Sequence, residues 1–64
     1  MPRLTATEVL EQAKELQKEF KAINAHWSLY ACAESICEND TNVVFDNDRL
    51  TALREAAKID NGQA

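Results

Sequence analysis

The chain has 64 residues and a formal net charge of −4 at neutral pH, from seven Lys and Arg against eleven Asp and Glu. A chain this short buries only about 60% of the surface that its unfolded form exposes, so its core is small. One glycine, one proline and two cysteines exclude a collagen-like repeat and a disulfide-stapled secreted scaffold. The acidic balance disfavours DNA or RNA as the main ligand.

No apolar run approaches the roughly 18 residues of a membrane span. The residues after Met1 also lack the apolar stretch of a secretory signal. We therefore expect a cytoplasmic protein that makes no use of a membrane.

The first helix has a recognisable start, because Thr5 and Glu8 have the spacing of a capping box. Good helix formers dominate to about residue 22, and no Gly or Pro follows before Gly62. The sequence predicts one helix over residues 5–38, which would be roughly 50 Å long at the helical rise per residue. A break at Asn24-Ala25, giving three helices, is the main structural alternative.

Residues 39–46 are rich in Asn and Asp and predict a turn, with Phe45 and its neighbours as a hydrophobic plug beneath it. The pattern that follows predicts a second helix over residues 47–60, stopped by Asn61-Gly62. The expected fold class is all-α: a single domain over residues 1–64 in which a long N-terminal helix and a short C-terminal helix form an unequal hairpin.

Apolar residues recur along the predicted long helix at alternating steps of four and three, which is a heptad pattern. The short second helix would cover only its 25–38 half, so the first half needs another partner. A second copy of the chain is the simplest one. We therefore predict a homodimer through a coiled-coil seam formed by Val9, Ala13, Leu16, Phe20 and Ile23.

No residue pattern indicates an enzyme. Cys32 and Cys37 would lie about 140° apart around a helix and form no C-x-x-C motif, so we interpret them as buried free thiols. An intermolecular metal site or a reactive thiol is the alternative. His26 is the only histidine, and Ser28 would point away from it. We predict no catalytic, metal-ligating or cofactor-binding residue, and no cofactor.

The aromatic residues are the most informative feature, because Trp and Tyr are enriched at the centres of protein interfaces. Trp27 and Tyr30 would lie one turn apart on the same stripe. They are either ordinary core or a contact surface for another protein. Taking the second interpretation, we predict a partner-binding site formed by His26, Trp27, Tyr30, Glu34 and Phe45.

These features favour a small homodimeric regulator that binds and inhibits or modulates a cellular protein. The alternative is a DNA-binding regulator or antitoxin with a helix-turn-helix arrangement. It requires a break near Asn24-Ala25 and a basic recognition helix, and the basic residues of the second helix are cancelled by acidic ones.

The capped Thr5 start, the long heptad arm, the cluster from Trp27 to Tyr30 and the short returning helix resemble a known type of protein. They are similar to the small acidic all-helical inhibitors that bacteriophages and prophages direct against host factors, such as quorum-sensing anti-activators and anti-CRISPR proteins. The resemblance implies an inhibitor that covers a functional surface of a host protein.

Overall fold

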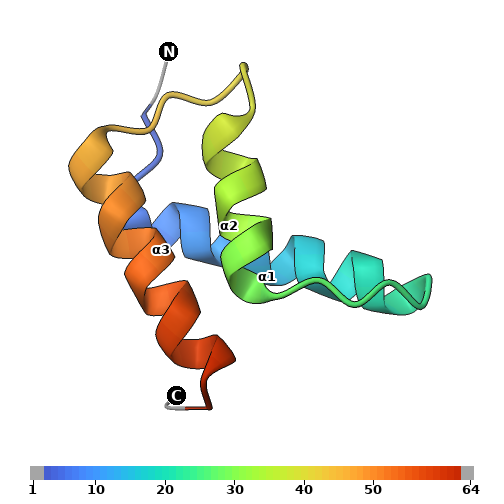
Figure 1. Ribbon diagram of the computed structural model, residues 1–64. Helices are drawn as coiled ribbons and strands as arrows, with labels where there is room; N and C mark the ends of the chain where they lie inside the picture. Colours follow the sequence, from blue (N-terminus) through green and yellow to red (C-terminus); the bar gives the residue numbers. More distant parts are fainter. Residues whose placement is uncertain (1–2, 63–64) are drawn as a thin grey trace.

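The computed structural model describes residues 3–62. It contains three helices, α1 (Ala6–Ala22), α2 (Leu29–Glu38) and α3 (Asp46–Asp60), which make the described chain 70% helical. Helices α2 and α3 lie side by side and run in opposite directions, while α1 crosses behind them and its last turns project beyond α2 (Figure 1). The all-α class is confirmed.

No strand occurs in residues 3–62. One isolated bridge joins Arg3 to Val43, and beside it the Leu4 N–H donates to the Val43 carbonyl at 2.8 Å. This contact fastens the segment before α1 to the loop before α3.

The start of α1 is the predicted capping box. The Thr5 hydroxyl accepts from the Glu8 N–H at 3.3 Å, and the Glu8 carboxylate accepts from the Thr5 N–H at 3.2 Å. Two N–H groups that a helix start leaves without partners are thereby satisfied.

The predicted continuous helix over residues 5–38 is wrong, because the chain breaks at Asn24. Asn24 has φ 62°, a left-handed conformation that Asn tolerates better than most residues. The Ala25 N–H donates to the Phe20 carbonyl at 2.8 Å and the Asn24 N–H to the Lys21 carbonyl at 3.1 Å. This pair of bonds is a Schellman motif, which ends a helix by satisfying its last carbonyls.

A new helix start follows four residues later. The Ser28 hydroxyl accepts from the Ala31 N–H at 3.1 Å and caps α2. The break and the cap together turn the chain back, so the three-helix alternative is the observed arrangement.

The turn occupies residues 39–45, and α3 begins at Asp46, one residue earlier than predicted. Within the turn, the Asn39 side-chain oxygen accepts from the Thr41 N–H at 3.0 Å. The predicted stop is confirmed: Asn61 is the C-cap, and Gly62 has φ 76° and donates to the Ile59 carbonyl at 3.0 Å.

The core lies where the three helices meet, and each helix contacts both others. Half of its buried residues are alanines, which let the helix backbones approach closely. The buried apolar residues are Val9, Ala13, Leu29, Cys32, Ala33, Ala52, Leu53 and Ala56.

Two residues of the predicted dimer seam, Val9 and Ala13, are thus fully buried within a single chain. The expectation of an uncovered N-terminal half was wrong, because the break at Asn24 folds α2 and α3 back across it. The unequal hairpin is replaced by a short hairpin of α2 and α3 crossed by α1 (Figure 1).

Candidate functional site

Trp27 lies in the segment between α1 and α2 and is held in place on two sides. Its ring stacks on Phe20 with the centroids 4.5 Å apart and an interplanar angle of 17°. Its carbonyl accepts from the Gln17 side-chain amide at 3.0 Å. Trp27 nevertheless keeps 45% of its surface exposed. The fold therefore presents a large aromatic ring to solvent in a fixed orientation.

Two hollows in the surface meet at Trp27, and their charges have opposite signs. The first, of about 530 Å³, we call the basic hollow; it is lined by Gln17, Lys18, Lys21, Ala25, His26, Trp27 and Ser28. The second, of about 490 Å³, we call the acidic hollow; it is lined by Trp27, Ala31, Glu34, Ser35, Glu38 and Asn39. The two hollows and the ring between them form the Trp27 face.

The charged side chains of the Trp27 face have no partners within the described chain. The ion pairs in residues 3–62 join Arg3 to Asp48 and Lys58 to Glu55. Neither pair involves a residue of the basic or the acidic hollow. The charges of both hollows are therefore available to a ligand or partner.

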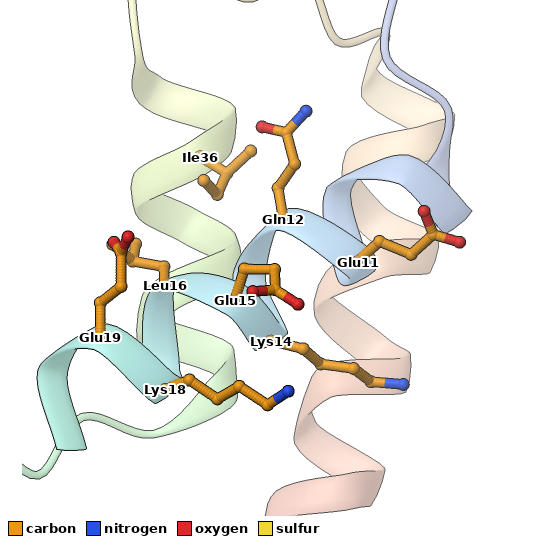
Figure 2. Close-up of a pocket in the computed structure, with 8 residues that line it drawn as sticks. All are labelled: Glu11, Gln12, Lys14, Glu15, Leu16, Lys18, Glu19 and Ile36. Atoms are coloured by element: carbon orange, nitrogen blue, oxygen red, sulfur yellow. The ribbon is translucent and has the colours of Figure 1, made fainter. Parts of the chain in front are cut away.

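A third hollow, of about 700 Å³, lies between α1 and α2 and differs in character (Figure 2). Figure 2 shows Gln12 and Leu16 on the side of α1 nearer Ile36, and Lys14 and Lys18 on its far side. Its charged lining alternates between Glu and Lys along α1. Such interleaved charges are typical of a solvated helix face, and this face has no clear preference for the sign of a ligand.

At the other end of α2, Phe45 occupies the N-cap position of α3. Its side chain is 58% exposed and makes no capping hydrogen bond. The Arg3 guanidinium lies over the ring at 4.7 Å from its centroid and also pairs with Asp48. The predicted plug beneath the turn is wrong for Phe45; Val44 is the half-buried residue that packs against the core.

The start of α2 is closed by a carboxylate from the end of α3. The two side-chain oxygens of Asp60 accept from the Leu29 and Tyr30 N–H groups, each at 2.9 Å. The Asp60 charge also lies at the positive end of the α2 dipole. Because this helix start is fully satisfied within the chain, Asp60 has a structural role.

The structure separates the predicted partner-binding residues into two groups. His26 and Trp27 line the basic hollow, Glu34 lines the acidic hollow, and Tyr30 lies at the start of α2 with 41% of its surface exposed. Phe45 is the N-cap of α3, and α3 starts near the end of α2 that is opposite to Tyr30 (Figure 1).

The predicted dimer-interface residues are also dispersed. Apart from Val9 and Ala13 in the core, Leu16 and Phe20 are half-buried against it, and only Ile23, at 72%, is largely exposed.

The sequence interpretation missed the basic hollow. Lys18 and Lys21 lie near the end of α1, and they join His26 once the chain turns at Asn24. The available signal was His26, two residues after Asn24. An Asn at this position can adopt the left-handed conformation, which turns the chain back towards the last turn of α1.

Both cysteines are free; Cys32 is buried and Cys37 is half-buried. Burial, reinforced by the Asp60 charge, raises the pKa of the Cys32 thiol above its ordinary value of about 9.0. Burial also raises the pKa of Cys37, where Arg49 acts in the opposite direction. Neither thiol has the low pKa that a reactive cysteine needs.

We expect the free energy of unfolding to fall as the pH rises above about 9, because the thiols ionise more readily in the unfolded chain. A single thiol can contribute a slope of no more than about 1.4 kcal/mol per pH unit. Urea denaturation at pH 8, 9 and 10 measures it. Cys32→Ala should show a shallower decline than the parent chain, and an identical decline would contradict the assignment.

Within residues 3–62, no group of three or more His, Cys, Asp or Glu side chains is placed to hold a metal ion. None of the described helices combines the length and the apolar character needed to cross a membrane. No protein-family model matches the sequence, and neither a curated protein nor a solved structure matches the chain. What the protein does must be inferred from its own surfaces.

Proposed function

We propose that this protein is a small non-enzymatic interaction module, a homodimeric regulator that binds a cytoplasmic protein and inhibits or modulates it. The observation that carries the proposal is the exposed ring of Phe45 at a position where helix capping favours a different residue. Phe45 and the start of α3 would form the surface that meets the target.

The N-cap of a helix is strongly selective for Ser, Thr, Asp and Asn, and an apolar residue there forfeits about 1 kcal/mol of stability. A 64-residue chain has little stability in reserve, on the order of 3–10 kcal/mol. Departures from such local rules concentrate at functional sites. A phenylalanine that makes no capping hydrogen bond and is 58% exposed is therefore better explained by contact with a partner than by folding.

The ring is also prepared for binding. Arg3 covers part of it and is itself anchored by Asp48, so the ring has lost freedom before any partner arrives. Ordering in advance reduces the entropy that binding costs. Leu50, 54% exposed in the second turn of α3, adds apolar surface at the same end of the molecule.

The long heptad arm on which the resemblance to phage-encoded inhibitors partly rested is absent, because α1 ends at Ala22. The chain still agrees with such inhibitors in size, acidity and helical content. Such an inhibitor acts by covering a surface of its target. The target of this chain would be a protein whose functional surface offers an apolar pocket for Phe45.

The DNA-binding alternative gains one observation, since the break that it requires is present at Asn24. Its second requirement is unmet, because α3 carries one more acidic than basic residue over Asp46–Asp60. Measuring fluorescence anisotropy of random-sequence duplex DNA at low salt would favour this alternative if the DNA bound tightly and released with rising salt.

Phe45→Ser should separate binding from folding. Serine supplies the missing N-cap hydroxyl, which stabilises α3, and removes the contact between Arg3 and the Phe45 ring, which destabilises it. The melting temperature should therefore stay level or rise by a few degrees. Capture of the target from a bacterial lysate by the immobilised chain, read by mass spectrometry, should be lost.

The matched control is Ile23→Ser, which removes an exposed apolar side chain at the C-cap of α1 rather than at the start of α3. It should leave capture intact. If the Phe45→Ser chain captures the same protein as the parent chain, Phe45 does not form the target surface.

A further inference from the structure

We propose that the Trp27 face is the surface on which two copies of the chain form a twofold dimer, with the basic hollow of each copy placed over the acidic hollow of the other. This inference rests on the proposed function, because it assigns the dimer interface of that regulator. It leaves Phe45, which lines neither hollow, free for the target.

The first argument is the distribution of charge. The cations Lys18 and Lys21, with His26 beside them, line one side of Trp27 without any acidic neighbour in the lining. On the other side, Glu34 and Glu38 line the second hollow without any basic neighbour. A partner that fits this face must therefore be acidic on one side of an apolar centre and basic on the other.

The second argument is symmetry. In a twofold interface the same patch is used by both copies, so a residue on one side of the axis meets a residue from the other side. With the axis near Trp27, rotation carries the basic hollow onto the acidic one. The Trp27 face is therefore complementary in charge to a second copy of itself. The basic hollow of each copy meets the acidic hollow of the other.

The third argument is the state of the side chains. Trp27 is stacked on Phe20 and 45% exposed, so it can supply a rigid aromatic centre of the kind that dominates interface energies. The charged side-chain groups of Lys18, Lys21, Glu34 and Glu38 have no ion-pair partner within residues 3–62. A second copy would supply a partner for each.

The interface area is compatible with the size of the molecule. A standard interface buries roughly 800 Å² on each partner. The chain exposes 4592 Å², so such a contact would occupy a minor part of its surface. Phe45 lines neither hollow and remains exposed beside such an interface.

The test is an exchange of charges in the full chain, read by sedimentation velocity over a dilution series. One variant carries Lys18→Glu with Lys21→Glu, and the other carries Glu34→Lys with Glu38→Lys. In each variant alone, both halves of the interface place like charges together. Four pairs change because every contact occurs twice, and self-association should weaken by about a hundredfold.

Mixing the two variants should restore the dimer. In the mixed pair, the new glutamates of one chain face the new lysines of the other, and the untouched hollows face each other with their original charges. The mass of a dimer should reappear in the equimolar mixture and should weaken with salt. A chain that combines all four substitutions should self-associate again.

The matched control is Lys14→Glu with Lys58→Glu, which makes the same change in net charge outside both hollows. It should self-associate as the parent chain does. Far-ultraviolet circular dichroism of every variant checks that the helices are retained.

A parent chain that stays monomeric at high micromolar concentration would overturn the proposal. So would single variants that dimerise normally, or a mixture that stays monomeric. If a monomeric parent chain instead binds a poly-glutamate peptide through Lys18 and Lys21, the occupant is an acidic segment of another protein. Capture of the target by Phe45 is measured separately, so failure of the dimer and failure of the proposed function remain distinguishable.

Discussion

Replacing Leu29 by Ala should lower the free energy of unfolding by about 2–5 kcal/mol, the range for a large side chain truncated in a packed core. Leu29 is 1% exposed and is among the largest fully buried side chains of the protein. It is the first residue of α2, at the junction with α1 and α3. Because the total stability expected for 64 residues is on the order of 3–10 kcal/mol, this single change removes much of it.

The control for Leu29 is the same substitution at Leu50, which is 54% exposed in α3. Leu50→Ala removes the same atoms from a site with little packing, and alanine is a good helix former, so its effect should stay within about 0.5 kcal/mol. Urea denaturation followed by circular dichroism measures both. Similar midpoints for the two variants would mean that the three-helix core does not centre on α2.

The features predicted correctly from the sequence are local ones. The capping box at Thr5 and the stop at Gly62 depend on residues within one helical turn of each other. A hydroxyl three residues before a glutamate, or a glycine after a helical stripe, acts in the same way in any fold. The all-α class follows from such signals summed along the chain.

The helix break was predicted only as the alternative to a continuous helix, because its signal is weak and a stronger pattern conceals it. Asn24 ends α1 at a position where glycine is the usual residue. The heptad steps continue in phase through Trp27 and Tyr30, so the seam looks unbroken in sequence. Ser28 was the overlooked clue, because a serine before an apolar pair is a good N-cap.

The surfaces follow from the break. Once α1 ends near residue 23, the segment that follows runs back towards Lys18 and Lys21, and His26 joins them. The acidic hollow forms because Trp27 then lies beside the outer side of α2. Which residues come together on either side of Asn24 depends on the tertiary arrangement of the two segments. The periodicity of apolar residues along one helix cannot predict that arrangement.

Replacing Asp60 by Ala should lower the free energy of unfolding by about 2–4 kcal/mol. The change removes both acceptors of the Leu29 and Tyr30 N–H groups, and an unmet donor costs about 1–3 kcal/mol when it is shielded from water. The Leu29 N–H is the more shielded of the two. The favourable contact between the carboxylate and the α2 dipole is lost as well.

Asp60→Asn should be milder, because the amide keeps one acceptor oxygen but loses the charge. It should also lower the pKa of the Cys32 thiol, since the Asp60 charge contributes to raising it. Alkylation of Cys32 would then begin at a lower pH. A general loss of stability would change the alkylation rate at a given pH but would not account for such a shift in its pH dependence.

Asp40→Ala is the control for Asp60, because Asp40 is an exposed acidic residue in the turn before α3. Its removal should change the unfolding midpoint by no more than a typical surface substitution, within about 0.5 kcal/mol. If Asp60→Ala and Asp40→Ala unfold at the same urea concentration, the end of α3 does not hold the start of α2. The Trp27 face, which begins at that junction, would then be less rigid than the Gln17 and Phe20 contacts imply.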